Sequence, residues 1–174
     1  MKIRLHLLTI IVSCSFSTML IAQNAIIDSL EQLIDSRHVH DTIKMIALDE
    51  LGWIYAETDF DKSETIAKKL IALSKKNKHY LQLAKSYNLL GSVYGYQSKD
   101  LEIIIGAYNK GLQALENEKN ELIRANMLNN MGLDYQNAGI NDKAFSLHQE
   151  ALQIGENEKH TYTIMLCLNN IATI

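Results

Sequence analysis

The chain has 174 residues, of which 47% are hydrophobic and 21% are charged, and it contains no proline. This composition is typical of a globular domain with a substantial core, and it excludes an intrinsically disordered chain. The formal net charge of -3 leaves no basic surplus to neutralise phosphates, so the sequence predicts no nucleic-acid partner.

The first 23 residues are predicted to be a secretory signal peptide that is not part of the fold. Lys2 and Arg4 precede an apolar run from Leu5 to Ala22, and the chain then turns polar. A short basic start, an apolar run and small residues near its end describe such a signal. One alternative is an uncleaved membrane anchor, because about 18 apolar residues nearly suffice to cross a bilayer. The others are a lipoprotein cleaved before Cys14 and a buried helix.

An exported protein, periplasmic or associated with the membrane through its N-terminal segment, follows from the signal prediction. Removing that segment would also remove Cys14, so Cys167 would be the single remaining cysteine. One cysteine cannot form an internal disulfide, and export therefore does not imply a disulfide-stapled fold here. Cys167 stands between two leucines on an expected helix and is predicted to be a buried, inert thiol.

Residues 24–40 are predicted to form an N-terminal capping helix ahead of the repeats. The stretch from Ile26 to Ile34 is short and amphipathic, which suits a helix that covers the first face of an array. His38 and His40 are two positions apart, a spacing that needs a strand-like backbone and further ligands to hold a metal. Because no further ligands cluster nearby in the sequence, we expect no metal site.

A unit of about 40 residues recurs from residue 41 onward. In each of the first three instances, an apolar or aromatic residue stands four positions before a glycine and an apolar residue stands directly before it. A tyrosine follows three positions after the glycine. The glycines are Gly52, Gly91 and Gly132, and Ala172 takes the same place in a fourth unit, at intervals of 39, 41 and 40 residues. A steady period of this length indicates a repeat array. The repeats run over about 41–78, 79–119 and 120–159, with a partial repeat over 160–174.

Each repeat is predicted to be two helices joined by a polar turn, at 59–61, 98–100 and 139–141. A glycine inside a helix costs roughly 0.5–1 kcal/mol relative to alanine, so its recurrence at one place predicts the close approach of a neighbouring helix. The tyrosines three positions later share one register and are predicted to pack: Tyr55, Tyr94 and Tyr135. The second helices carry small and larger residues in a common register: Ala67, Leu70 and Ile71; Tyr108, Gly111 and Leu112; Ala144, His148, Ala151 and Leu152.

The third repeat resembles the tetratricopeptide repeat through Leu128, Met131-Gly132, Tyr135, Gly139, Ala144 and Ala151. The resemblance covers roughly Asp41 to Ile174. The chain departs from the family in having Ser63 where an alanine is usual, no proline after the second helix, and a period about six residues longer than the common 34. The resemblance implies an all-α fold: an α-solenoid of antiparallel helix pairs in a right-handed superhelix, truncated in its fourth repeat.

A narrower resemblance is to the exported N-terminal repeat region of bacterial sensor histidine kinases and transcription regulators. It rests on an apparent signal followed by DSLEQLIDS, on DTIKMIALDELGWIY in the first repeat, and on LAKSYNLLGSVY after it. Such regions present a ligand- or partner-binding surface whose state is passed to a downstream domain. A severed sensory input domain is therefore one hypothesis for this chain, and the nucleotide sequence beyond Ile174 would decide it.

In this repeat family the first helices line the concave side of the solenoid, so we predict that a partner binds there. Polar residues recur three positions before the glycine, and a row of amides with a few aromatic side chains suits a peptide held through its backbone. The predicted groove residues are Asp49, Trp53, Glu57, Lys85, Asn88, Ser92, Tyr96, Asn126, Asn129, Leu133, Gln136, Asn137 and Asn169. The alternative for the asparagines is that they mainly bond neighbouring helices: Asn129, Asn130, Asn169 and Asn170.

The leading hypothesis is a non-enzymatic scaffold that binds a protein or peptide segment and uses no cofactor. No glycine-rich phosphate loop, GxSxG or HExxH motif is present in the sequence. Asp134 and Glu150 are predicted to lie on solvated faces, and His148 is predicted to be packed. A hydrolase built on the groove is a further alternative. The last helix, over about 162–174, has no following helix, so we expect it to expose apolar residues and to favour self-association.

Overall fold

The computed structural model describes residues 23–116 and 118–174. All but the last residue of the predicted signal peptide, and with it Cys14, therefore lies outside the described residues. The chain divides into two compact units, one that ends at Ala47 and one over Leu48–Ile174. The division falls inside α2 (Asp41–Ala56), the helix that begins at the predicted start of the repeats. Within its described part, the first unit holds a helix over residues 23–35 and the beginning of α2.

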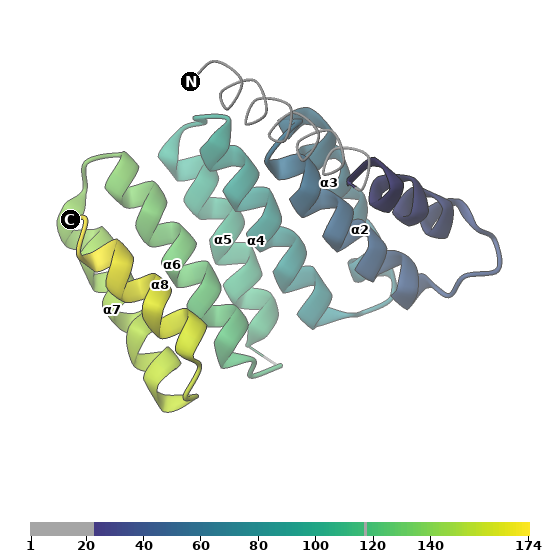
Figure 1. The fold of residues 1–174 in the computed structure, drawn as a ribbon. Coiled ribbons are helices and arrows are strands. Elements are labelled where there is room, and N and C mark those ends of the chain that lie inside the picture. Colours follow the sequence, from purple (N-terminus) through teal and green to yellow (C-terminus); the bar gives the residue numbers. More distant parts are fainter. Residues whose placement is uncertain (1–22, 117) are drawn as a thin grey trace, which may run out of the picture. The chain divides into compact units, whose positions relative to one another are not determined.

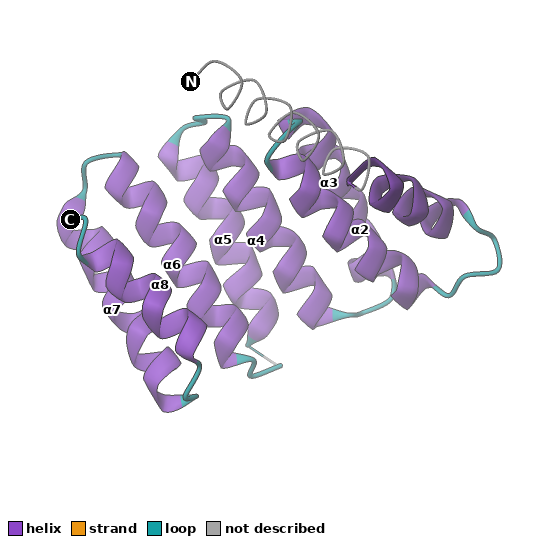
Figure 2. Ribbon diagram, in the orientation of Figure 1, coloured by secondary structure: helices purple, strands orange, loops and turns teal. Residues whose placement is uncertain are grey.

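The described residues are almost entirely helical and contain no strand (Figure 2). The helices are α2 (Asp41–Ala56), α3 (Phe60–Lys76), α4 (Tyr80–Tyr96), α5 (Leu101–Leu115), α6 (Glu121–Asn137), α7 (Asn141–Asn157) and α8 (Thr161–Ile171). These bounds confirm the predicted all-α array of helix pairs. None of the helices in the described part of the chain combines the length and the apolar character needed to span a bilayer.

In the second unit the helices pack in two rows (Figure 1). Helix α4 packs against α3 and α5, α6 packs against α5 and α7, and α8 packs against α7. In addition, α4 contacts α6 and α6 contacts α8, so the first helices of successive repeats lie side by side. We call the side of α4, α6 and α8 that faces away from α5 and α7 the first-helix face.

Side-chain caps set where helices begin, and residues with a left-handed backbone conformation set where they end. The carboxylate of Asp59 accepts a hydrogen bond from the Lys62 amide at 3.1 Å, and the Asn120 side chain accepts one from the Ile123 amide at 3.0 Å. These are N-caps, which satisfy amides that have no partner inside the helix. The turns after α3 to α7 each contain a residue with positive φ, the usual helix stop: Lys78, Ser98, Lys119, Gly139 and Lys159.

The recurring glycine gives room to a side chain of a packed helix. A Cβ atom on Gly91 would lie 2.7 Å from the ring of Tyr108, and one on Gly132 would lie 2.6 Å from the ring of His148. A Cβ atom on Gly52 would collide with Leu89 of the next repeat. The prediction of a close approach is thus refined, because what approaches Gly91 and Gly132 is a ring from the second helix of the same repeat.

Candidate functional site

A continuous chain of polar side chains joins α4 to α6 on the first-helix face. Asn88, Ser92 and Tyr96 are four residues apart and lie along one side of α4. The side-chain amide of Asn130 on α6 donates to the Asn88 carbonyl oxygen at 3.1 Å and to Ser92 Oγ at 3.4 Å. Both amide hydrogens of Asn130 are therefore used to tie the second repeat to the third.

Tyr108 extends this chain from beneath α4. Its ring is fully buried and lies against Gly91, and its hydroxyl donates to Asp134 Oδ2 at 3.0 Å. Since that hydrogen is used, Ser92 Oγ, which is 3.2 Å away, is the donor to the tyrosine oxygen. Burial, and next the carboxylate of Asp134, raise the pKa of Tyr108 well above its usual value, so the hydroxyl keeps its proton. We call Asn88, Asn130, Ser92, Tyr108 and Asp134 the polar ladder.

The polar ladder ends on the carboxylate of Asp134, which can only accept hydrogen bonds when it is ionised. Asp134 is partly buried, and the absence of a side chain at Gly95 leaves room for its Oδ1 against α4. Burial raises the pKa of Asp134 to about 6, and the hydrogen bond from Tyr108 partly opposes that shift. The prediction that Asp134 is a freely solvated carboxylate is therefore wrong.

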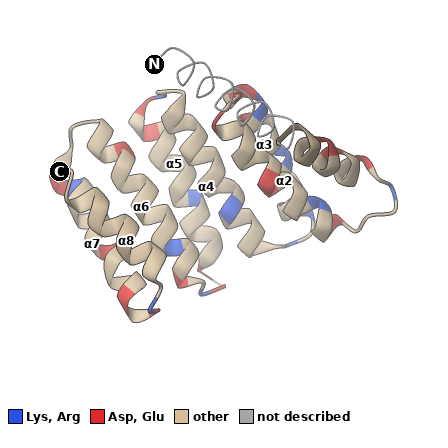
Figure 3. Cartoon of the chain, viewed as in Figure 1, with Lys and Arg blue, Asp and Glu red and all other residues tan. Residues whose placement is uncertain are grey.

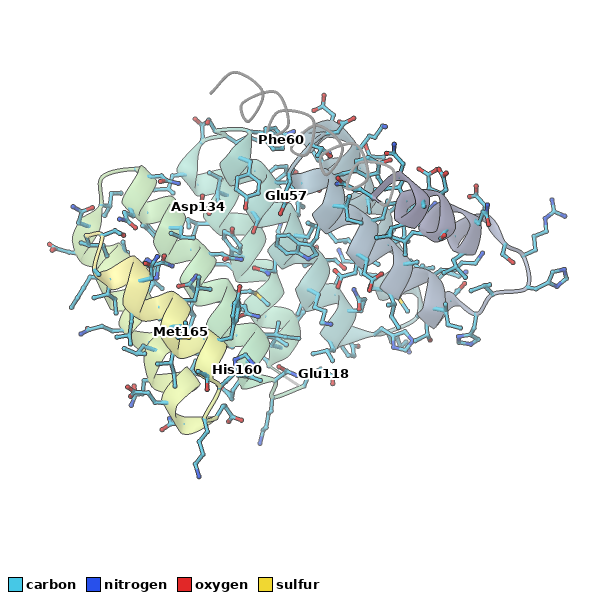
Figure 4. The ribbon with its side chains drawn as sticks, in the orientation of Figure 1. Glu57, Phe60, Glu118, Asp134, His160 and Met165 are labelled. Atoms are coloured by element: carbon cyan, nitrogen blue, oxygen red, sulfur yellow. The ribbon has the colours of Figure 1, made fainter. Side chains whose placement is uncertain are left out.

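The ladder reaches the surface at a group of aromatic and acidic side chains. The rings of Tyr96 and Phe60 are stacked with centroids 5.8 Å apart, although their exposed fractions are 55% and 40%. Burial first, and then the charges of Asp134 and Glu57, raise the pKa of Tyr96. Glu57, Phe60 and Asp134 lie toward the same end of the helices (Figure 4). We call Glu57, Phe60, Tyr96 and Asp134 the aromatic–acidic patch.

A second polar cluster lies inside the protein between α6, α7 and α8. The side-chain oxygen of Asn129 is 3.0 Å from His148 Nδ1, 2.9 Å from Asn170 Nδ2 and 3.6 Å from Cys167 Sγ. Burial lowers the pKa of His148 and raises the pKa of Cys167 to about 11, so both groups are held neutral. Cys167 and His148 are buried, as predicted, whereas Asn129 is an interior residue and not an accessible one.

The other predicted groove residues fall into three classes. Asn88 and Ser92 are buried in the polar ladder. The exposed ones are Glu57, Tyr96, Asn126, Leu133, Asn137 and Asn169. The partly buried ones already have contacts: Trp53 packs on the core, Gln136 donates to the Thr173 carbonyl at 3.1 Å, and Asp49 and Lys85 interact electrostatically. The visible side of α4, α6 and α8 carries few charged residues (Figure 3).

Sequence reasoning missed Tyr108, Phe60 and Asp134 as site residues. For Asp134 a signal was present, because the position two after the repeated glycine reads Ile54, Val93, Asp134 and Ile174. An acid in an otherwise apolar column marks a carboxylate with a special partner. For Tyr108 the signal was its place opposite the glycine, where the third repeat has His148.

No cluster of three or more metal-ligating side chains occurs in the described part of the chain. His40 Nδ1 accepts a hydrogen bond from the Thr42 amide at 3.3 Å, which makes it a local helix cap. Comparison of the chain with protein-family models, with curated proteins and with solved structures gave no match. A functional proposal therefore has to follow from the chemistry of the first-helix face.

Proposed function

We propose that this chain is a non-enzymatic binding module that holds a peptide or protein segment on its first-helix face. The observation that carries the proposal is the aromatic–acidic patch, in which two stacked, exposed rings occur toward the same end of the helices as the carboxylates of Glu57 and Asp134 (Figure 4). Exposed aromatic side chains that are already held in place are the usual anchors of protein interfaces. The exported location expected from the N-terminal segment would place this surface outside the cytoplasm.

The chemistry of the patch favours a basic side chain, and arginine above lysine. A guanidinium group can stack on the ring of Tyr96 and at the same time donate hydrogen bonds to a carboxylate. A cation–π contact at an exposed site contributes about 0.5–1 kcal/mol, and a hydrogen bond to a charged group about 1.5–3 kcal/mol. Because the Tyr108 hydroxyl holds the carboxylate of Asp134, little ordering of that side chain is needed on binding.

The described side chains offer little to a catalytic mechanism. His148 is completely buried and Cys167 is a neutral, buried thiol, so neither can meet a substrate at the surface. Tyr108 is sealed beneath α4 with its proton committed to Asp134. A binding role therefore agrees better with this site than proton transfer or nucleophilic attack does.

A labelled arginine peptide provides the test. We expect a fluorescein-labelled peptide with arginine between two leucines to bind the full chain, measured by fluorescence anisotropy. Tyr96→Ala and Asp134→Asn should each weaken binding about tenfold, which corresponds to about 1.4 kcal/mol. Asp134→Asn keeps an acceptor for Tyr108, so the fold is preserved.

Two controls make that result specific. Glu156→Gln removes one negative charge from an exposed position of α7 and should leave the affinity unchanged. Citrulline in place of arginine keeps the shape of the side chain and removes its charge, and should abolish most of the binding. The proposal would be refuted if Tyr96→Ala, Asp134→Asn and Glu156→Gln bound the arginine peptide with equal affinity, or if the arginine and citrulline peptides bound equally well.

A further inference from the structure

A second surface, away from the aromatic–acidic patch, has the shape of a binding groove. Two adjoining hollows of about 390 and 400 Å³ lie along α4 and α5, and they share Tyr87 and Lys110. Together they extend from Tyr80 to Tyr94 on α4, about 21 Å at 1.5 Å per helical residue. An extended peptide advances about 3.3 Å per residue, so about six residues fit this length. We call it the α4–α5 groove.

Gly106 lines this groove, and packing within the protein does not explain why a glycine stands there. It lies in the interior of α5, yet a Cβ atom placed on it would have no other atom within 4 Å. In the same helix, a Cβ atom on Gly111 would lie 2.9 Å from the sulfur of Met127. Packing thus explains Gly111 but not Gly106, whose presence costs helix stability relative to alanine. A glycine with open space beside it lets the backbone of a bound chain come close to α5.

The charges along the groove indicate what it would hold. Lys75 and Lys110 line one hollow together with apolar and tyrosine side chains, and the ammonium group of Lys75 lies 5.6 Å from the centre of the Tyr87 ring. Lys110 makes no salt bridge with any residue that the structure describes. The other hollow combines apolar side chains, among them Ile103, which is 49% exposed, with Tyr94 and the carboxylate of Glu102, so its end away from Lys75 favours an apolar group over a second acid. A carboxylate at the lysine end and an apolar side chain beside Ile103 would complement both hollows.

We propose that the α4–α5 groove binds an acidic peptide segment in extended form. A carboxylate of the peptide pairs with Lys75 and Lys110. An apolar side chain of the peptide lies against Ile103, beside Gly106, which has no side chain to obstruct the groove. This site uses the side of α4 opposite to the polar ladder and is independent of the function proposed for the first-helix face. It would let the chain bind a basic segment and an acidic segment at the same time.

A fluorescein-labelled hexapeptide in which leucine and glutamate alternate is the probe for this groove. We expect it to bind the full chain, and the same peptide with glutamine in place of glutamate to bind at least tenfold more weakly. Lys110→Glu should weaken binding about tenfold, because a repulsive pair replaces an attractive one. Gly106→Leu should also weaken it by filling the groove, while circular dichroism should show an intact fold.

The matched control is Lys69→Glu, which makes the same charge change at an exposed position of α3 that does not line the groove. It should leave the affinity within about twofold, since a distant exposed charge is screened by salt. Equal loss in Lys69→Glu and Lys110→Glu would overturn the proposal, as would no binding at about 1 mM peptide. Weaker binding in Tyr96→Ala but not in Gly106→Leu would overturn it too, because the peptide would then occupy the first-helix face.

Discussion

Replacing Gly132 with alanine is expected to destabilise the second unit, although alanine is the better helix former. The added methyl group would lie 2.6 Å from the ring of His148, closer than a carbon contact allows. The ring cannot easily move away, because it is completely buried and its Nδ1 is hydrogen-bonded to Asn129 at 3.0 Å. The substitution therefore forces either a shift of α7 or the loss of that hydrogen bond.

The magnitude follows from two opposing effects. Alanine gains roughly 0.5–1 kcal/mol over glycine in a helix interior. Overpacking of a filled core costs typically about 1–3 kcal/mol. We therefore expect Gly132→Ala to lower the free energy of unfolding by about 1–2 kcal/mol. At Gly106, where a new Cβ atom has no neighbour within 4 Å, only the helix effect operates, and Gly106→Ala should raise the free energy of unfolding.

The assay is urea unfolding of the two variants and the parent chain, followed by circular dichroism. A double-variant cycle isolates the contact: in a His148→Ala background the ring is gone, and Gly132→Ala should become neutral or stabilising. If Gly132→Ala stabilises the parent chain as much as Gly106→Ala does, the ring of His148 does not need the space at Gly132, and the predicted steric conflict is refuted.

Two further predictions concern pH. The pKa of folded His148 lies below the unfolded value of about 6.5, so the unfolded chain takes up the proton first and the free energy of unfolding should fall as pH drops below that value. Asp134 has a raised pKa of about 6 and contributes in the opposite direction, because its stabilising effect is lost as pH rises through 6. To isolate the effect of His148, urea unfolding should therefore be compared between Asp134→Asn and Asp134→Asn/His148→Gln. A pH dependence below 6.5 that is the same in both would contradict the assignment of His148. For the arginine peptide, affinity should decline as pH falls from 7 to 5 because Asp134 becomes protonated, and anisotropy titrations of Asp134→Asn should show a flatter profile.

The helix array was predictable because the repeat fixes the register of every helix at once. Glycines at 52, 91 and 132 place equivalent turns of three first helices, and the turns at 59–61, 98–100 and 139–141 lie within a few residues of the observed helix ends. Because the sequence repeats with a regular period, an incorrect boundary predicted for one helix can be corrected from the equivalent helix of the next repeat.

The site was less predictable because it depends on helical phase and on contacts between repeats. The position three before the glycine was expected to face a groove throughout, yet Asn129 is 2% exposed and Asn88 is 8% exposed. In the fourth repeat Asn169 is exposed while Asn170 is buried, so the register of this column does not carry over. The bond between Tyr108 and Asp134 spans 26 positions and joins two repeats, a pairing that no pattern within one repeat can reveal.

That pairing also limits how freely the repeats could be exchanged. Gly91 and Tyr108 belong to the same repeat, as do Gly132 and His148, whereas Gly52 packs against Leu89 of the next repeat. The hydroxyl of Tyr108, however, needs a carboxylate that only the following module supplies. An artificial protein made by reordering these modules would strand a buried phenol without its acceptor, at a cost of about 1–3 kcal/mol per misplaced junction. The order of the repeats is therefore fixed by hydrogen bonds between them as well as by contacts such as that of Gly52 with Leu89.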